Sequence, residues 1–341
     1  MKLLLLVLIF LSEPFAGQYA RGFLISGPRE CRNLDIFHPR TGELQQKFRI
    51  ISNRNYCSPG SLGVRDLVLP LKGVFTHSTS QIAFFERLGA ITDVVGTNGF
   101  IWVSSNLMQR RIVSNLIRET ASPLKEGEVE LVFLSGSYKP SSIQFNEYLE
   151  PHPLGYAEWI RVVGLLTQRQ ALADFFFEAQ KLRYLKIRSL VSDLKYRPLV
   201  LLNSVYDGKW PVPGGDTWWG QFIEDAGANY VFSHLQGVSI GLPVSEVLLK
   251  ASQADVWLNP GAFSCQELEK KIPGSQKIKA WQRGEVYARP SASGGGDDWY
   301  ESGLANPDKA LHELISILHP DRLEQKYNRW FLPLSSDDKG D

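Results

Sequence analysis

Residues 169–194 read RQALADFFFEAQKLRYLKIRSLVSDL and contain neither proline nor glycine, the two residues that most often interrupt a helix. Their apolar side chains recur at helical spacing, for example at Leu172, Phe175 and Leu185. A helix of about 26 residues spans about 39 Å, which is longer than one lobe of a globular protein needs. An ordinary long surface helix would give the same pattern, but the length favours a rigid strut between two lobes.

Strand-like and helix-like patterns alternate on both sides of this stretch. The strands predicted before it lie at 73–76, 92–95, 99–102 and 129–134, with helices at 80–88 and 106–119. The strands predicted after it lie at 198–203, 229–232, 256–259 and, as a late edge strand, 285–288, with helices at 216–226, 245–251 and 307–318. Such alternation is typical of parallel strands covered by helices. The sequence therefore predicts an α/β fold of two Rossmann-like lobes with parallel sheets, joined by one long α-helix.

The N-terminal part is organised differently. Residues 1–18 have a basic start, a short apolar run and small residues at the end, which are the features of a signal peptide; a buried first strand is the alternative. No cysteine follows the apolar run, so we expect a soluble periplasmic or secreted protein without a lipoprotein anchor. The expected units are a signal peptide (1–18), an N-terminal addition packed on the first lobe (19–66), the first lobe (67–167), the linker helix (168–195), the second lobe (196–322) and a polar C-terminal tail (323–341).

Charge and cysteine content exclude several classes of function. The chain has 37 basic and 36 acidic residues, so there is no electrostatic signature of nucleic-acid binding. Cys31 and Cys57 can pair in an oxidising compartment and leave Cys265 over, or all three thiols can stay free. Their spacing matches no zinc site. No nucleophile elbow, HExxH motif or phosphate-binding loop occurs, so we assign no catalytic residue.

Two tryptophan-rich loops carry the strongest functional signal. Residues 210–220 read WPVPGGDTWWG, and residues 294–301 read GGGDDWYE. Tryptophan offers a large apolar face, and glycine lets a bulky guest approach the backbone. Loops at the carboxyl ends of parallel strands line the usual ligand crevice of α/β sheets. By these two criteria the candidate ligand-binding residues are Ser78, Trp102, Ser137, Tyr138, Trp210, Asp216, Trp218, Trp219, Asn259 and Trp299. Asp216 is also a candidate helix N-cap.

Four segments, in their order and spacing, resemble the substrate-binding proteins of ABC importers for iron complexes and cobalamin. They are EYLEPHPLGYAEW at 147–159, GGDTWW at 214–219, ADVWLNPG at 254–261 and DWYESG at 298–303. The resemblance extends from about residue 73 to about residue 320. It implies two α/β lobes joined by one helix, a cleft that holds a ferric siderophore, haem or a corrinoid, and a membrane permease as partner. No cofactor is implied beyond this ligand, and we expect a monomer.

The resemblance also implies residue roles. Trp210, Asp216, Trp218, Trp219 and Trp299 would lie near the cleft. One surface glutamate on each lobe would contact arginines of the permease. Glu301 is the candidate on the second lobe and Glu86 on the first, although Glu86 does not align with the acidic position of the family.

Three alternatives remain open at this stage. His77 or His152 with Asp216 or Asp297 suits a zinc or manganese ion, but no spacing motif supports it, and we assign no metal ligand. A haem guest needs an axial ligand, for which Tyr138, Tyr206 and Tyr300 are available. Finally, Asp216 and Glu301 could form the carboxylate pair of a secreted carbohydrate-active enzyme.

Overall fold

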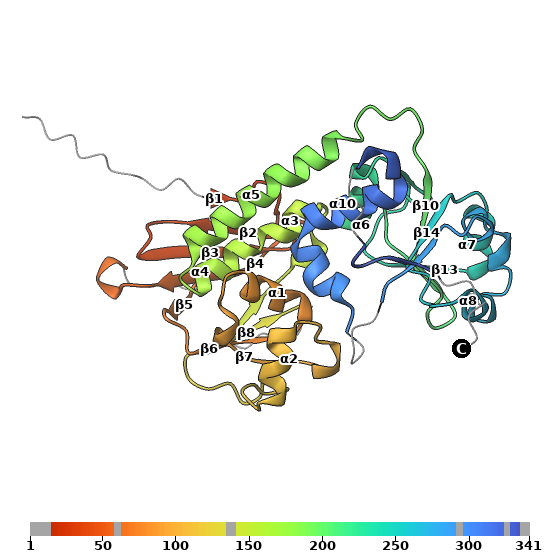
Figure 1. Cartoon of the computed structure of the whole chain (residues 1–341). Coiled ribbons are helices and arrows are strands. Elements are labelled where there is room, and N and C mark those ends of the chain that lie inside the picture. Colours follow the sequence, from red (N-terminus) through yellow and green to blue (C-terminus); the bar gives the residue numbers. More distant parts are fainter. Residues whose placement is uncertain (1–14, 58–62, 134–140, 291–295, 324–327, 335–341) are drawn as a thin grey trace, which may run out of the picture.

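The computed structural model describes residues 15–57, 63–133, 141–290, 296–323 and 328–334. Parallel β-sheets covered by helices occur on both sides of a long helix (Figure 1), so the predicted α/β class with two lobes is confirmed. In the described parts of the chain, no helix has the combined length and apolarity needed to cross a membrane.

The first lobe is built on a four-stranded parallel sheet in the order β7-β6-β8-β9. Its strands are β6 (Gly73–Thr76), β7 (Val94–Thr97), β8 (Glu128–Val132) and β9 (Ser142–Gln144). Its helices are α1 (Thr79–Arg87) and α2 (Asn106–Val113). A capping box formed by Ser78 and Gln81 begins α1 directly after β6, so the start of this helix lies at the carboxyl edge of the sheet.

The second lobe has a five-stranded sheet in the order β12-β10-β14-β15-β16, in which only β16 is antiparallel to its neighbour. The strands are β10 (Leu199–Leu202), β12 (Asn229–Tyr230), β14 (Val256–Leu258), β15 (Val286–Ala288) and β16 (Leu332–Pro333). A two-stranded ribbon joins β11 (Trp210–Val212) to β13 (Ile240–Leu242). The helices are α6 (Trp218–Asp225), α7 (Val244–Lys250), α8 (Cys265–Lys271), α9 (Lys279–Gln282) and α10 (Pro307–Leu318).

Three consecutive helices lead from the first lobe to the second: α3 (Pro153–Glu158), α4 (Ile160–Leu166) and α5 (Gln170–Ser189). Helix α5 runs along the first lobe before the chain crosses to β10 (Figure 1). It buries one stripe of side chains, Ala173, Phe177, Gln180 and Tyr184, and leaves its other faces at least partly exposed. Helix α5 ends at Ser189 and is therefore shorter than the predicted helix at 169–194. The left-handed backbone of Gln168 (φ 58°) separates it from α4, and the hydroxyl of Ser192 bonds back to the carbonyl of Ser189 beyond its end.

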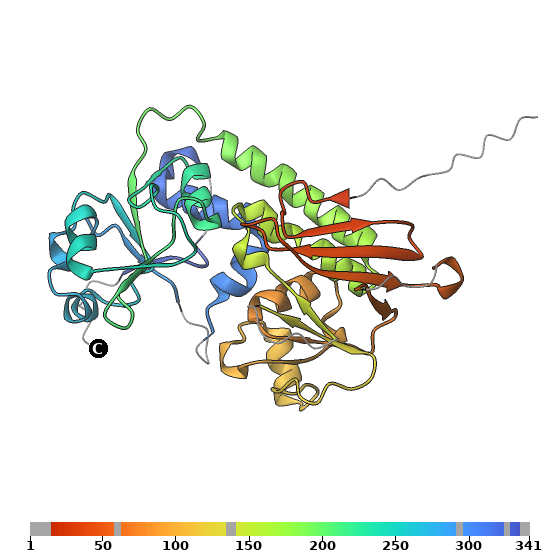
Figure 2. The same ribbon diagram turned by 180° about the vertical axis from the view of Figure 1, so that it is seen from behind.

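The N-terminal residues form a five-stranded sheet in the order β1 to β5. Its strands are β1 (Phe15–Ala16), β2 (Phe23–Ser26), β3 (Cys31–Phe37), β4 (Leu44–Ile51) and β5 (Arg65–Val68). Figure 2 shows this sheet, in red and orange, beside the green helices of the first lobe. Because β1 pairs with β2, the sheet includes the end of the predicted signal peptide; residues 1–14 lie outside the described part.

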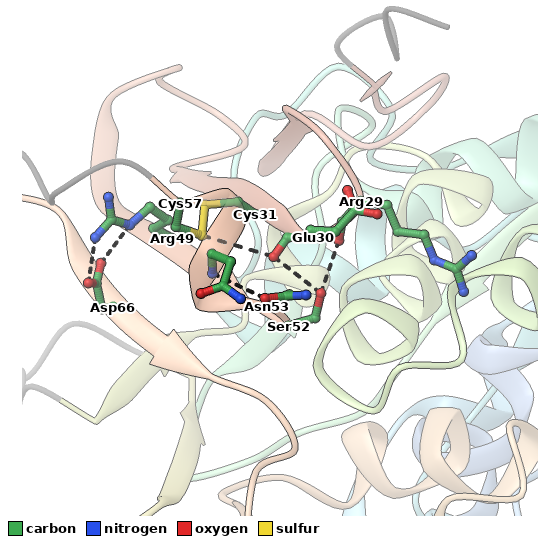
Figure 3. Close-up of a disulfide and its surroundings, with 9 residues drawn as sticks. Arg29, Glu30, Cys31, Arg49, Ser52, Asn53, Cys57 and Asp66 are labelled. Carbon is green, nitrogen blue, oxygen red and sulfur yellow. Dashed lines mark hydrogen bonds and ion pairs between the residues drawn. A yellow bond between two sulfur atoms is a disulfide. The ribbon is translucent and has the colours of Figure 1, made fainter.

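A disulfide between Cys31 and Cys57 joins the start of β3 to the segment after β4 (Figure 3). The hydroxyl of Ser52 approaches the carbonyl of Glu30 at 3.2 Å beside it. Cys265 has no disulfide. Of the two alternatives left open by the sequence, the structure therefore shows the bridge.

Replacing both Cys31 and Cys57 by serine should lower the free energy of unfolding by about 3.5 kcal/mol, because the bridge joins residues 26 positions apart and restricts the unfolded chain. Urea unfolding followed by circular dichroism measures this difference. The matched control is Cys265→Ser, which removes a thiol without removing a crosslink and should shift the curve far less. Equal shifts for the two variants would contradict a stabilising role of the bridge.

Four local predictions are corrected by the structure. Residues 99–102 are not a strand, because Gly99 takes a left-handed backbone (φ 64°) and a short 3-10 helix, η3 (Phe100–Trp102), follows. The helix predicted at 106–119 ends at Val113. Strand β15 is not an edge, because β16 pairs with it. Within the predicted tail 323–341, Trp330 and Phe331 are buried, so the core of the second lobe continues past residue 322.

Candidate ligand-binding cleft

A cavity of about 630 Å³ lies between the two lobes. This volume is in the range of small-molecule sites. The described residues that line it from the first lobe are Ser78, Ser80, Phe133, Glu147, Tyr148 and Tyr156. Those from the second lobe are Asn203, Ser204, Val205, Tyr206, Pro211, Pro213, Trp218, Trp219, Val238, Ser239, Asn259, Gly261, Lys271, Tyr300 and Leu304. Most of these side chains are aromatic or apolar, and a few hydroxyl, amide and charged groups lie among them.

Stacked indoles form one wall of the cavity. Thr217 caps α6 by accepting from the N–H of Gly220, and this places Trp218 and Trp219 at the start of the helix, facing the cleft. Their ring centroids are 5.1 Å apart, and Trp219 stacks in turn on Trp299 at 4.9 Å. Across the cleft, Tyr156 on α3 meets Trp218 edge-on at 6.3 Å. Both adjacent tryptophans therefore line the cavity, which the sequence alone left undecided.

Close backbone packing makes this wall possible. A Cβ atom on Gly215 would lie 2.1 Å from the carbonyl oxygen of Ser233, and one on Gly220 would lie 2.4 Å from the carbonyl oxygen of Gly215. A larger residue at Gly215 would push this loop away from the segment at Ser233, and one at Gly220 would push α6 away from the loop. Gly215 and Gly220 are therefore needed for the close backbone packing of this loop.

The first lobe contributes a small polar network at its side of the cavity. The hydroxyls of Ser78 and Ser80 lie 2.8 Å apart, and Ser80 donates to Oε1 of Glu147 at 2.6 Å. Glu147 belongs to the short helix η4 (Glu147–Leu149) and is 1% exposed. Burial raises the pKa of Glu147 to about 8. Of this network, the sequence analysis nominated only Ser78.

The second lobe contributes two asparagines at the carboxyl ends of adjacent parallel strands. Asn203 follows β10 and Asn259 follows β14, and both take a left-handed backbone (φ 63° and 61°). Nδ2 of Asn259 donates to Oδ1 of Asn203 at 3.0 Å. The expectation that ligand-facing residues gather at this edge of the sheet therefore places Asn259 correctly beside the cavity.

Several nominated residues lie away from the cavity. Trp210 is fully buried, stacks on Trp257 at 5.5 Å and donates to the carbonyl of Leu202. Trp299 is fully buried one layer behind Trp219. Trp102 is 57% exposed and is not among the lining residues. Ser137 and Tyr138 lie outside the described residues.

Asp216 forms an ion pair with Arg40 and accepts from the N–H of Gly237 at 2.9 Å. It is neither a lining residue nor the cap of α6, because Thr217 takes the capping position. The ion pair connects the N-terminal sheet, through the turn that contains Arg40, to the second lobe. The carboxylate pair considered for a carbohydrate-active enzyme is therefore not assembled at the cavity, since Glu301 does not line it either.

Glu301 is not a surface residue. It is 2% exposed, and its carboxyl group accepts from the backbone N–H of Ser104 at 2.7 Å and of Ser105 at 3.0 Å, next to the start of α2. Burial raises its pKa to about 8. Glu301 thus connects the second lobe to the first, and the prediction of an exposed docking glutamate at this position is wrong. Glu86 is exposed on α1 and accepts from the hydroxyl of Ser105.

The two histidines considered as metal ligands have other partners. Nε2 of His77 lies 2.9 Å from Glu130, and its Nδ1 lies 2.9 Å from Asn98. His152 caps α3 by accepting from the N–H of Leu154. Throughout the described ranges, no group of three or more His, Cys, Asp or Glu side chains is arranged to hold a metal ion.

Comparison with known proteins agrees with this architecture. Residues 139–292 match the family described as periplasmic binding protein. An uncharacterized lipoprotein of Methanocaldococcus jannaschii is 23% identical over 296 residues, which cover 77% of this chain and 69% of the relative.

Three solved structures share the fold. A periplasmic binding protein from Veillonella parvula has a TM-score of 0.55 and 12% identity, and the match covers 84% of this chain and 98% of that one. A protein of an ABC-type Fe³⁺-hydroxamate transport system from Saccharomonospora viridis has a TM-score of 0.52 and 13% identity, with coverage of 72% and 93%. Staphylococcus aureus IsdE complexed with heme has a TM-score of 0.51 and 17% identity, with coverage of 72% and 98%.

One prediction is overturned by these comparisons, and one is upheld. The similarity to a lipoprotein contradicts the expected localisation, a soluble periplasmic or secreted protein without a lipid anchor. The resemblance to substrate-binding proteins is confirmed by the sequence of one segment and by the fold of most of the chain. Residues 139–292 thus match the periplasmic binding protein family, and most of the chain has the α/β fold of a solved periplasmic binding protein.

Proposed function

We propose that this protein captures a metal chelate, namely a ferric siderophore, haem or a corrinoid, and delivers it to the permease of an ABC importer. The observation that carries the proposal is the aromatic-walled cavity between the two lobes. Its volume and its stacked indoles suit a large, partly flat guest. The function is binding, docking and release, with no bond made or broken.

The contacts between the lobes also suit a binding protein that opens little. Besides the connection after α5, Glu301 binds the backbone of Ser104 and Ser105, and Arg87 on α1 donates to Asn306 before α10. These contacts tie the two walls of the cavity to each other and would limit their separation. A rigid site of this kind loses little conformational entropy when it binds a guest.

Titration with a ferric trihydroxamate, haem or a corrinoid tests the proposal. We expect one of these classes to quench tryptophan fluorescence with a saturable one-site curve and to be recovered chemically unchanged. If all three classes fail to bind, or if the bound chelate is converted to another compound, the proposal is wrong.

Trp218→Ala should weaken binding of that chelate by about 1 kcal/mol or more, which is about fivefold in Kd, because the indole supplies contact area on the cavity wall. Isothermal titration calorimetry measures the change. Trp102→Ala is the matched control, because Trp102 is exposed and lies outside the cavity lining; it should leave Kd unchanged. The reverse order of effects would place the site at η3 instead of the cleft.

A further inference from the structure

The cavity has very few charges for its size. Among its described lining residues, Glu147 is the only acid and Lys271 the only base. Lys271 is exposed, and its Nζ donates to the carbonyl of Gly261 at 2.6 Å. Arginine, the usual partner of carboxylates and catecholates in a partly buried site, is missing from this described lining. A guest with several negative charges would therefore meet a single counter-charge among the described lining residues, that of the exposed Lys271, which leaves most of its charge unpaired and is costly.

Among the described lining residues, two buried side-chain polar atoms lack a hydrogen-bond partner. Oε2 of Glu147, on the first lobe, is buried and unpartnered, while Ser80 occupies Oε1 of the same carboxyl group. Oγ of Ser204, on the second lobe, is also buried and unpartnered. A buried polar atom without a partner is unfavourable. The same atoms become favourable when a guest supplies the missing bonds, and the two residues line the cavity from different lobes.

The protonation state of Glu147 sets the chemistry that complements it. Burial raises the pKa of Glu147 to about 8 against the opposing effect of its hydrogen bonds, and the nearby Glu150 raises it further. At neutral pH the carboxyl group is therefore mostly protonated, so it has both an O–H donor and a carbonyl acceptor. An amide likewise has both a donor and an acceptor, whereas a carboxylate has acceptors only.

We propose that the guest is an uncharged metal chelate with amide groups on its rim, such as a corrinoid with amide side chains or a trihydroxamate complex with an amide backbone, and that Glu147 and Ser204 each bind one amide from opposite lobes. This inference rests on the proposed chelate-binding function and narrows it. It favours neutral trihydroxamate complexes and amide-rimmed corrinoids over tricatecholate complexes, and over haem with its two propionates.

The test uses matched pairs of chelates that differ in charge. One pair is a corrinoid whose rim groups are amides and the same corrinoid after hydrolysis of these groups to carboxylates. The other pair is a neutral ferric trihydroxamate and a trianionic ferric tricatecholate. In calorimetric titrations of the full chain, we expect the uncharged member of at least one pair to bind at least about tenfold more tightly than its partner, a difference of about 1.4 kcal/mol. The pair that shows the difference identifies the source of the amide-type groups.

Variants then assign the preference to particular residues. Glu147→Leu removes the hydrogen-bonding group at nearly the same volume and should weaken binding of the uncharged chelate about tenfold. Glu147→Gln keeps a donor and an acceptor, so it should retain most of the affinity. Ser204→Ala should weaken binding of the same chelate about threefold to tenfold. The fold should tolerate this small change. The matched control is Glu313→Gln, because Glu313 is a buried carboxyl group outside the cavity lining whose backbone donors all reach Oε1, which glutamine keeps. The affinity of this variant should equal that of the wild type.

Failure of this inference is distinguishable from failure of the proposed function. If neither haem nor any chelate of the two pairs binds the wild-type protein, both are overturned. If haem alone binds, the function stands and this inference is wrong. If a chelate binds but the anionic member of each pair binds more tightly, the function stands and the charge preference is wrong. If Glu147→Leu and Ser204→Ala, checked for folding by circular dichroism, both bind the uncharged chelate like the wild type, the assignment of the two residues is wrong. Should Glu147→Leu not fold, Ser204→Ala decides.

Discussion

Trp299→Ala is expected to lower the free energy of unfolding by about 3–5 kcal/mol, the usual cost of truncating a large buried aromatic side chain. Trp299 is fully buried, and its ring stacks on Trp219 at 4.9 Å and meets Phe331 edge-on at 4.9 Å. Alanine would leave a void between the cavity wall and the C-terminal segment. Urea unfolding followed by near-UV circular dichroism, which reports on the packed indoles, measures the loss.

Trp102→Ala is again the matched control, because it removes the same side chain from an exposed position and should change stability by less than about 0.5 kcal/mol. A loss below about 1 kcal/mol for Trp299→Ala would contradict the view that this indole supports the stack. Trp219 rests directly on Trp299, so we also expect the variant to weaken chelate binding although Trp299 does not line the cavity.

The features that local sequence determines were predictable. The helix α10 has the predicted bounds, 307–318, because Pro307 lies in its first turn and its apolar side chains recur at helical spacing. The long helix and the alternation on both sides of it were recognised for the same reason, and they were enough to predict the fold class. Trp218 and Trp219 could be placed at the cleft because the loop after a parallel strand leads into α6.

The features that depend on distant contacts were not predictable. Trp210 and Trp218 look alike in the sequence, but Trp210 stacks on Trp257 in the core while Trp218 reaches the cavity. The sequence likewise does not show that Glu301 accepts two backbone bonds from residues about 200 positions earlier, which buries it between the lobes. Ser80 and Glu147 meet from different elements, so only the first lobe as a whole brings the polar network together.

The N-terminal sheet was underestimated as a small addition. It closes the first lobe on the side of α3 and α4, and Arg40 at the turn between β3 and β4 reaches the second lobe by pairing with Asp216. Because Asp216 directly precedes the cap of α6, this pair also fixes the loop that presents the two cleft tryptophans. We therefore regard the sheet as a support of the binding site.

Glu158 anchors the segment that leads into the N-terminal sheet, so Glu158→Ala should lower the free energy of unfolding by about 3–5 kcal/mol. Glu158 is fully buried, and its carboxyl oxygens accept the backbone N–H groups of Gln18, Tyr19 and Ala20 at 2.8–3.0 Å. Nε of the buried Arg161 lies 3.5 Å away. Alanine would leave three donors unpaired and reduce the counter-charge of a buried arginine.

The free energies of unfolding of Glu158→Ala and Glu178→Ala, measured by urea titration, separate the anchoring role of Glu158 from a general effect of removing a negative charge. Glu178 pairs with the same Arg161, at 2.8 Å, but its side chain is 40% exposed, so its removal should cost no more than about 1 kcal/mol. Hydrogen exchange should show loss of amide protection in β2 and β3 for Glu158→Ala only, because the segment that leads into β2 is released. Equal losses of stability for the two variants, or unchanged protection of β2, would mean that other contacts hold the sheet and that Glu158 is not its anchor.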